Sequence, residues 1–265
     1  MTDEVLLERH GDVAVLRLNQ PQRLNPLGQP LQKLLRAHLQ RLADDRSVRA
    51  LVLTGEGKAF CVGADLSSMK PPAAGQSLGE QTSQTMLELS NQLIEDLRRM
   101  PFPVVSAING PCAGAGVGLA LAADVVIAAQ SAYFYLPFMP RLGIVPDLGT
   151  TWFLERFVGR ARAVGMSLLG ERLSGAQAAQ WGLIWGCVDD AQLQAQALAL
   201  AGRLASLPAH AAREIRQIYE SAGSNTLSEQ LRLEAARQRE LIDRPEFMEG
   251  VQAFLGKREP KFPPR

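Results

Sequence analysis

Residues 109–120 read Asn109-Gly-Pro-Cys-Ala-Gly-Ala-Gly-Val-Gly-Leu-Ala120, directly after the uncharged run Val104-Val-Ser-Ala-Ile108. A short apolar run that ends in glycine-rich residues is typical of a buried strand followed by a turn. The first residues of a helix after such a turn leave backbone N–H groups without partners, and these groups bind oxygen anions. Residues 104–120 therefore predict a strand, a turn and the start of a buried helix.

A second segment of this kind lies about fifty residues earlier. Gly55-Glu-Gly-Lys-Ala-Phe-Cys-Val-Gly-Ala-Asp-Leu66 follows the apolar run Ala50-Leu-Val-Leu-Thr54, and we expect it also to lead into a helix. The small residues Ala64, Ala115 and Gly116 would let a ligand oxygen approach the backbone amides closely. Two such turns facing each other would bind an oxyanion, as acyl-transfer and enolate chemistry require.

Each turn also has a purely structural interpretation. Both turns could be tight connections between packed elements, with no ligand between them. Asp65 suits the N-cap position of the helix expected after the first turn. The residues of the turns alone leave these alternatives open.

The composition restricts the class of protein. The chain has 265 residues, 46% of them hydrophobic, and a formal net charge of +1. This suits one large domain, alone or with a small appendage, and argues against a nucleic-acid surface. Cys61, Cys112 and Cys187 lack metal-ligand spacing, which predicts reduced thiols, no metal and a cytoplasmic location. The uncharged run 104–123 is interrupted by Asn109-Gly-Pro111, which favours a strand, a turn and a helix over a membrane span.

Apolar patterns along the rest of the chain predict strands that alternate with helices. Strands are expected at residues 4–9, 13–18, 50–54, 104–108, 124–129 and 133–136, the first two forming a hairpin. Helices are expected at residues 27–42, up to about 99 after a loop at 70–75, up to 122, and at 192–204, 209–222, 227–242 and 245–255. Buried strands between helices predict an α/β fold with a parallel sheet. Because the pattern becomes all-helical, we place a domain boundary between residues 1–205 and 206–265.

Together with four further segments, the two turns resemble the signatures of the enoyl-CoA hydratase/isomerase (crotonase) family, and they occur in the family's order. The further segments are Asn19-Gln-Pro-Gln-Arg-Leu-Asn-Pro-Leu27, Leu142-Gly-Ile-Val-Pro-Asp-Leu-Gly149, Ala178-Ala-Gln-Trp-Gly-Leu183, and Glu249-Gly-Val-Gln-Ala-Phe254 with Lys257-Arg258. The resemblance implies a crotonase-like spiral of ββα units with a C-terminal helical oligomerisation region that packs trimers or hexamers. It implies an acyl-CoA thioester as substrate, with coenzyme A part of that substrate and no separate cofactor.

The resemblance also assigns the oxyanion site and shows a departure from the hydratase pattern. It carries the two hole donors onto the N–H groups of Ala64 and Ala115. Hydratases of the family use two glutamates, whose positions fall on Gly118 and on Phe138 or Met139 here. Because neither position holds a carboxyl group, a water-adding mechanism with two carboxylates is not expected.

Asp147 is the remaining candidate for an acid–base group. Its neighbours in residues 143–149 are apolar, so burial should raise its pKa and make it a better base. Several isomerases of the family have a similar Pro-Asp loop, and moving a double bond from the 3- to the 2-position of an enoyl-CoA needs only one base. The alternative is that Asp147 caps a helix that begins near Gly149.

The resemblance further implies which residues contact the substrate. Gln22, Arg23 and Leu24 match the segment that meets the adenosine diphosphate end, and Arg23 suits a phosphate. Phe254 and Lys257 match residues that reach the nucleotide from a neighbouring subunit. Val62, Asp65 and Leu66, which flank Ala64, complete the predicted substrate-binding set. The alternative for these positions is a solvated surface.

Several functions stay open within this family. The favoured one is a 3-enoyl-CoA to 2-enoyl-CoA isomerase in fatty acid metabolism. Hydration, thioester hydrolysis and decarboxylation are alternatives with the same oxyanion site. A non-catalytic acyl-CoA binder that has lost its acids is a further alternative, which Gly118 together with Phe138 and Met139 favours. No sequence pattern identifies the acyl group.

Overall fold

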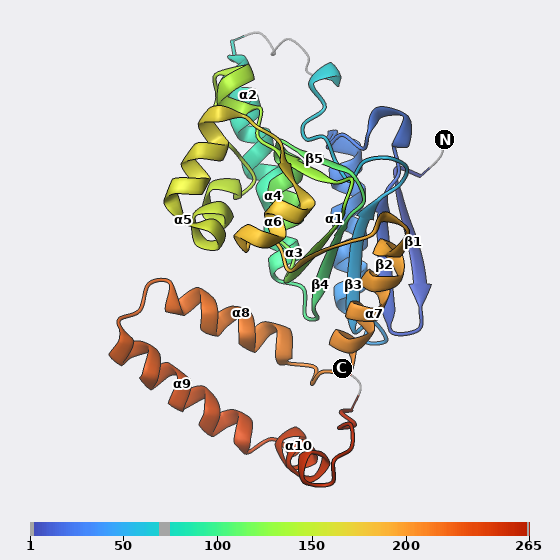
Figure 1. Ribbon diagram of the computed structural model, residues 1–265, viewed down its shortest axis with the longest axis vertical. Helices are drawn as coiled ribbons and strands as arrows, with labels where there is room; N and C mark the ends of the chain where they lie inside the picture. Colours follow the sequence, from blue (N-terminus) through green and yellow to red (C-terminus); the bar gives the residue numbers. More distant parts are fainter. Residues whose placement is uncertain (1–2, 69–74, 264) are drawn as a thin grey trace.

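A twisted sheet lies on the right-hand side of the molecule in the view of Figure 1. The computed structural model describes residues 3–68, 75–263 and 265. Within these residues a six-stranded sheet has the order β1-β2-β3-β4-β6-β9. Its strands are β1 Val5–His10, β2 Val13–Leu18, β3 Ala50–Gly55, β4 Val104–Ile108, β6 Val125–Ala129 and β9 Gly186–Val188.

The pairing of these strands confirms the predicted hairpin and parallel sheet. β1 and β2 are antiparallel, whereas β2–β3, β3–β4, β4–β6 and β6–β9 are parallel pairs. Every residue of β3 and of β4 is buried. Strands with no exposed face need helices on both sides of the sheet, which explains why their sequences are continuous apolar runs.

A second, three-stranded sheet was only partly expected. It has the order β5-β7-β8, with β5 Pro111–Ala113, β7 Tyr133–Tyr135 and β8 Leu173–Ser174. The strand β7 confirms the prediction at 133–136. The strand β5 was missed, because three residues inside a glycine-rich turn form a strand only through pairing with a distant segment.

Helices cover the six-stranded sheet and continue beyond it (Figure 1). They are α1 Gln29–Asp44, α2 Leu78–Thr85, α3 Asn91–Arg98, α4 Ala115–Leu121, α5 Thr150–Leu169, α6 Gly175–Trp181, α7 Leu193–Ala205, α8 Ala211–Ala222, α9 Leu227–Ile242 and α10 Pro245–Leu255. A π-helical turn, Met86–Ser90, joins α2 to α3, so the predicted long helix is confirmed. The predicted loop at 70–75 lies, except for Gly75, outside the described residues.

One helix prediction is wrong as far as the described residues extend. The first turn leads only to a single 3-10 turn, Leu66–Ser68. The Asp65 carboxylate accepts a hydrogen bond from Ser67 Oγ at 2.6 Å. Such local bonds from Asp and Ser compete with helix propagation, which explains the short turn.

The C-terminal helices differ from the others in their position. The helix α7 packs against the strands of the six-stranded sheet, whereas α8, α9 and α10 extend away from it (Figure 1). Arg216 of α8 anchors this extension, because it bonds both carboxylate oxygens of Asp124 and the carbonyls of Met100 and Phe102. The domain boundary at residue 205 stays a prediction, and it coincides with the end of α7.

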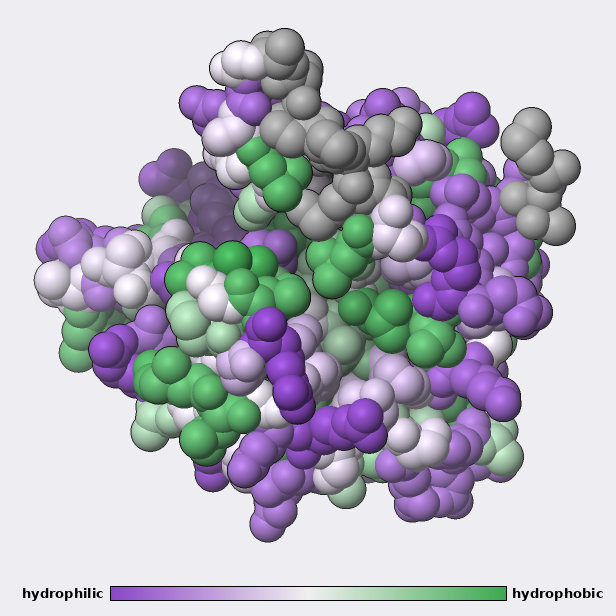
Figure 2. Space-filling view, turned by 90° about the horizontal axis from the view of Figure 1, so that it is seen from above, coloured by the Kyte–Doolittle hydropathy of each residue, from purple (hydrophilic) through white to green (hydrophobic). Residues whose placement is uncertain are grey.

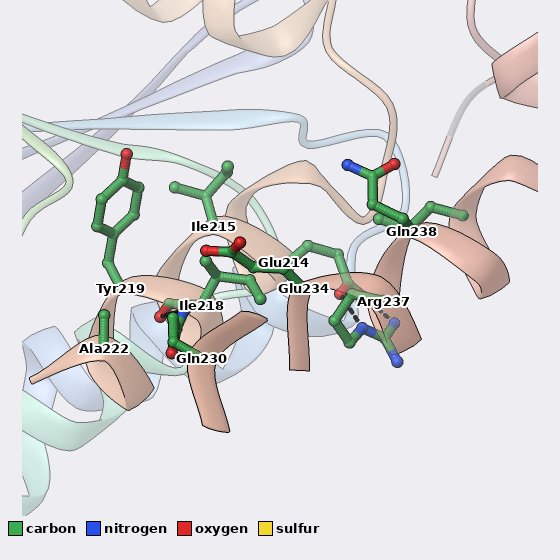
Figure 3. A pocket seen from close by; sticks show the side chains of 10 residues that line it. Glu214, Ile215, Ile218, Tyr219, Ala222, Gln230, Glu234, Arg237 and Gln238 are labelled. Atoms are coloured by element: carbon green, nitrogen blue, oxygen red, sulfur yellow. Dashed lines mark hydrogen bonds and ion pairs between the residues drawn. The ribbon is translucent and has the colours of Figure 1, made fainter. Parts of the chain in front are cut away.

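A groove of about 350 Å³ runs between α8 and α9 (Figure 3). Glu214 and Arg237 close its floor with two hydrogen bonds of 2.9 and 3.0 Å between guanidinium and carboxylate. Ile215 and Tyr219 line the groove with side chains that are 59% and 73% exposed. The two helices therefore present an apolar surface that nothing in this chain covers within the described residues.

Candidate active site

The Ala64 N–H is oriented by the residue before it. The Gly63 carbonyl accepts a hydrogen bond of 2.7 Å from the Leu27 N–H. Because a trans peptide is planar, the Ala64 N–H of the same peptide points in the opposite direction. Gly63 has a φ of +93°, and a Cβ added there would lie 2.9 Å from the Ala113 carbonyl oxygen. Only glycine fits this conformation and this close approach.

The Ala115 N–H is oriented in the same manner. The Gly114 carbonyl accepts a hydrogen bond of 3.0 Å from the Val117 N–H in the first turn of α4. The Ala115 N–H, on the opposite side of that peptide, is therefore directed away from the helix. Gly114 has φ 53° and ψ −131°, a combination open to glycine alone.

The structure brings the two turns together. A Cβ on Gly63 would lie 3.1 Å from Ala115 N and 3.3 Å from Gly114 Cα, so the backbones touch. Within residues 3–68, 75–263 and 265, neither the Ala64 nor the Ala115 N–H donates to a protein acceptor. Ala64 is exposed and Ala115 is buried, so one of the two amides lies at the surface and the other in the interior. Two adjacent unpaired amides have the arrangement of an oxyanion hole.

Asp147 is partly buried in the loop that precedes α5. Its Oδ1 has no hydrogen-bond partner among the described residues. Burial raises the pKa of Asp147 to about 6, although a hydrogen bond from its own N–H opposes the shift. The capping alternative is wrong, because the N-cap of α5 is Gly149 and no side chain caps that helix. A carboxyl group with one oxygen left unpaired and with a pKa near neutrality has the properties of a general base.

The Asp147 loop packs against the first turn of α4. A Cβ on Gly118 would lie 2.4 Å from the Leu148 carbonyl oxygen and 2.9 Å from Thr150 Oγ1. Gly118 lies three residues after Ala115, about 4.5 Å along the helix axis. Leu148, the neighbour of Asp147, therefore lies against α4 about one helical turn beyond Ala115. The same contacts leave no room for a side chain at Gly118.

The second position assigned to a hydratase glutamate holds an apolar side chain, that of Phe138 or Met139. Phe138 is buried, and its Cζ would lie 3.9 Å from a Cβ on Gly114. Its ring therefore packs beside the second turn. Met139 is 40% exposed on the π-helical turn Phe138–Leu142. The exposed apolar residues Ile144 and Val145 continue this surface toward Asp147.

Arg23 is bonded to the first turn. Its Nη2 donates to Asp65 Oδ1 and to Ser67 Oγ, both at 2.6 Å. The hydrogen bond from Ser67, followed by that from Arg23, lowers the pKa of Asp65. Gln22 and Leu24 are exposed on either side of Arg23. Arg23 thus holds the segment after Ala64 in place, a contact that the sequence did not indicate.

Residues 8–265 match the family described as enoyl-CoA hydratase/isomerase. The chain belongs to this family. It is 42% identical over 264 residues to the 1,2-epoxyphenylacetyl-CoA isomerase of Escherichia coli K12, covering 99% of both chains. It is 44% identical over 250 residues to a probable enoyl-CoA hydratase of Rhodobacter capsulatus, covering 94% of both chains.

Solved structures of the family share the fold. A crystal structure of an enoyl-CoA hydratase from Polaromonas sp. JS666 superposes with a TM-score of 0.90 at 32% identity, covering 98% of this chain and 99% of that chain. A putative enoyl-CoA hydratase/isomerase from Mycobacterium abscessus also gives 0.90, at 35% identity, covering 98% of this chain and all of that one. The crotonase-like fold predicted from the sequence is therefore confirmed.

The remaining predicted site residues of this family member fall into two groups, since Val62 and Leu66 flank Ala64 whereas Phe254 and Lys257 lie elsewhere. Val62 is partly buried, whereas Leu66 is 55% exposed directly after Asp65. Phe254 is 83% exposed at the end of α10, and Lys257 follows it with a φ of 51°. In Figure 1 α10 lies at the bottom, opposite the carboxyl ends of β2 and β3. One chain therefore does not bring Phe254 or Lys257 to its own site.

The face that carries the carboxyl ends of the parallel strands has a mixed surface. Figure 2 shows hydrophobic groups around the middle of this face and hydrophilic side chains toward its rim. In the part of the chain that the structure describes, no three His, Cys, Asp or Glu side chains are grouped as a metal ion would require. Among the same residues, no helix has the length and apolar composition needed to cross a membrane.

Proposed function

We propose that this family member is an acyl-CoA isomerase that moves a double bond from the 3- to the 2-position, with Asp147 as the base. The observation that supports this most directly is the Asp147 carboxyl, whose buried Oδ1 has no described partner. Its loop contacts α4 one turn beyond Ala115. The N–H groups of Ala64 and Ala115 supply the oxyanion hole in this proposal.

The reaction needs one carboxylate and one oxyanion site. The Asp147 carboxylate removes a proton from C2 of the 3-enoyl thioester, and the electron pair moves onto the thioester oxygen. The Ala64 and Ala115 amides stabilise the enolate, a type of contact whose loss costs about 3–4 kcal/mol in the transition state. The protonated Asp147 then returns the proton at C4, which leaves the double bond between C2 and C3. Atoms and charge balance without any further reactant.

Two observations favour isomerisation over hydration. A second carboxylate at Gly118 would require the Leu148 backbone to move, because a Cβ there lies 2.4 Å from its oxygen. At the other position the buried residue is Phe138, whose side chain has no acid for activating water. Thioester hydrolysis and decarboxylation use the same amides, and hydrolysis also uses a base, so the assay on a 3-enoyl-CoA separates these reactions from isomerisation. A non-catalytic binder would have no need of a carboxyl group with a buried, unpaired oxygen.

A second candidate substrate is 1,2-epoxyphenylacetyl-CoA. The relative that is 42% identical over nearly the whole chain has the name of an isomerase of this compound. Its methylene group next to the thioester offers the same acidic hydrogens to Asp147 and the same carbonyl to the two amides. The chemistry proposed for the site thus extends to this substrate.

The proposal includes a neighbouring subunit in a cytoplasmic trimer or hexamer. Phe254 and Lys257 are exposed and far from their own site, which suits a role toward another copy. Arg23 can still meet a phosphate, because its side chain is 49% exposed despite its bond to Asp65.

The first test is the substitution Asp147→Asn, assayed on a 3-enoyl-CoA, a 2-enoyl-CoA and 1,2-epoxyphenylacetyl-CoA. We expect isomerisation to fall by about two to four orders of magnitude, the usual contribution of a general base. Exchange of the C2 proton of a bound acyl-CoA in deuterated water should disappear in parallel. Isomerisation that survives the substitution undiminished would show that another group is the base. Addition of water by the wild-type protein to the 2-enoyl-CoA would show a hydratase.

A further inference from the structure

Two buried thiols lie directly beneath the oxyanion turns. Cys61 and Cys112 are fully buried free cysteines. Their backbones form an isolated parallel β-bridge, which joins the two turns. A Cβ on Gly116 would lie 3.0 Å from Cys61 Sγ, so this thiol occupies the space that the missing side chain leaves. Both cysteines therefore pack against the backbone that carries the oxyanion amides.

Each thiol makes a hydrogen bond to that backbone. Cys112 Sγ donates to the Gly116 carbonyl at 3.3 Å. The Gly63 N–H donates to Cys61 Sγ at 3.4 Å. Burial raises the pKa of Cys61 to about 12, and burial together with the neighbouring Cys61 raises the pKa of Cys112. Both thiols therefore keep their hydrogens at neutral pH, and Cys112 remains a donor.

The Cys112 bond connects to the Ala115 amide through two peptide groups. The Gly116 carbonyl that accepts from Cys112 belongs to the same peptide as the Val117 N–H. This N–H donates to the Gly114 carbonyl at 3.0 Å, and that carbonyl shares its peptide with the Ala115 N–H. Hydrogen bonds in such a chain polarise one another, so a donor at one end strengthens the free N–H at the other end.

On the first turn, the hydrogen bond at Cys61 reaches the residue next to Ala64 directly. Cys61 Sγ holds the N–H side of Gly63, while the Leu27 N–H holds its carbonyl side. Gly63 has no side chain to restrict it, and glycine loses more conformational freedom on ordering than any other residue. One hydrogen bond on each side of Gly63 fixes the plane of the next peptide, which carries the Ala64 N–H.

We propose that Cys61 and Cys112 are positioning residues that orient and polarise the Ala64 and Ala115 amides toward a thioester oxygen. The inference rests on the oxyanion site of the proposed function. It gives the two thiols a role in which neither sulfur contacts or attacks the substrate.

The test compares Cys112→Ala, Cys112→Ser and Cys61→Ala with the wild-type protein. The probe is hexanoyl-CoA labelled with carbon-13 at its carbonyl, whose infrared stretching frequency falls when hydrogen-bond donors polarise it. We expect Cys112→Ala to reduce this fall at full occupancy and to lower kcat about three- to tenfold, the effect of one hydrogen bond. The KM should change by less than about twofold, because the interaction strengthens in the transition state. Cys112→Ser keeps a hydroxyl donor and should recover part of both effects.

Cys187→Ala is the matched control, because Cys187 lies on the edge strand β9, away from both turns. It should leave the infrared frequency and kcat unchanged. A wild-type frequency in Cys112→Ala and Cys61→Ala, even with a lowered melting temperature, would show a structural role and overturn the inference. If the wild-type protein itself produced no shift of the bound carbonyl, the oxyanion site of the proposed function would fail, and this inference with it.

Discussion

A buried carboxyl oxygen without a hydrogen-bond partner is costly to maintain, and Oδ1 of Asp147 is such an atom among the described residues. Burial disfavours its charged form and raises the pKa of Asp147 to about 6. Other acids of this chain behave differently. Hydrogen bonds from Arg258 and Lys261, for example, lower the pKa of Glu249 to about 2. A carboxyl group whose pKa is raised, while the pKa of another acid is lowered, is typical of a site that takes up and releases a proton during its function.

The raised pKa predicts the pH dependence of the reaction. Asp147 acts as a base only when ionised, so kcat/KM should rise as the pH increases through about 6 and level off above 7. An aspartate with an ordinary pKa would instead keep the enzyme active down to about pH 4. Initial rates on a 3-enoyl-CoA between pH 4.5 and 8 measure this profile. A flat profile across this range would be incompatible with Asp147 as the base.

At the scale of elements, the contact between α4 and the loop before α5 decides which groups can enter the site. Gly118 of α4 has Leu148 and Thr150 at distances where a Cβ would overlap them. The backbone at Gly118 is helical, so the restriction is one of space and not of conformation. The glycine therefore lets the Asp147 loop lie directly on α4.

This contact predicts the effect of one added methyl group. Gly118→Ala should lower the free energy of unfolding by about 1–3 kcal/mol, because the Leu148 backbone has to move away. The same movement displaces Asp147, so kcat for isomerisation should fall as well. Chemical denaturation and initial rates measure the two effects.

Gly202 of α7 is the matched control for this substitution. It also lies inside a helix, but a Cβ added there meets no atom within 4 Å. Gly202→Ala should therefore raise stability by about 0.5–1 kcal/mol and leave the rate unchanged. Equal effects of the two substitutions would mean that the loop contact does not hold Asp147.

At the scale of the whole molecule, α8, α9 and α10 extend from the core with large apolar side chains on their surface. Ile215 and Tyr219 are exposed beside the groove between α8 and α9 (Figure 3). Exposed apolar surfaces of this kind are typical of protein interfaces. This supports the proposal that copies of the chain associate through the C-terminal helices.

Ile215→Glu should therefore separate the copies, because it places a charge in the proposed interface. Light scattering after size exclusion would measure the mass. The KM for an acyl-CoA should rise in the separated chain, since Phe254 and Lys257 of a neighbour would no longer reach the nucleotide. Gln217→Glu adds the same charge to an exposed position of α8 and is the control. A wild-type protein that is monomeric at working concentrations would contradict the proposal.

Much of the fold could be predicted from local pattern. The continuous apolar runs of β3 and β4 indicate strands buried on both faces, and the structure buries every residue of both. The bounds predicted for α9 and α10 agree with the structure. The three-residue strand β5 was missed, because its pairing with β7 links segments about twenty residues apart. Local periodicity cannot encode such a pairing.

The sequence by itself determined the family, the parallel sheet and the identity of the residues at the two turns, because these depend on residue order and hydrophobic period. Only the tertiary structure decided that Leu148 closes the space at Gly118 and that Asp147 Oδ1 is left without a described partner. The same holds for the bond of Arg23 to Asp65. These features arise from distances between residues 30 to 42 positions apart, and packing alone sets such distances.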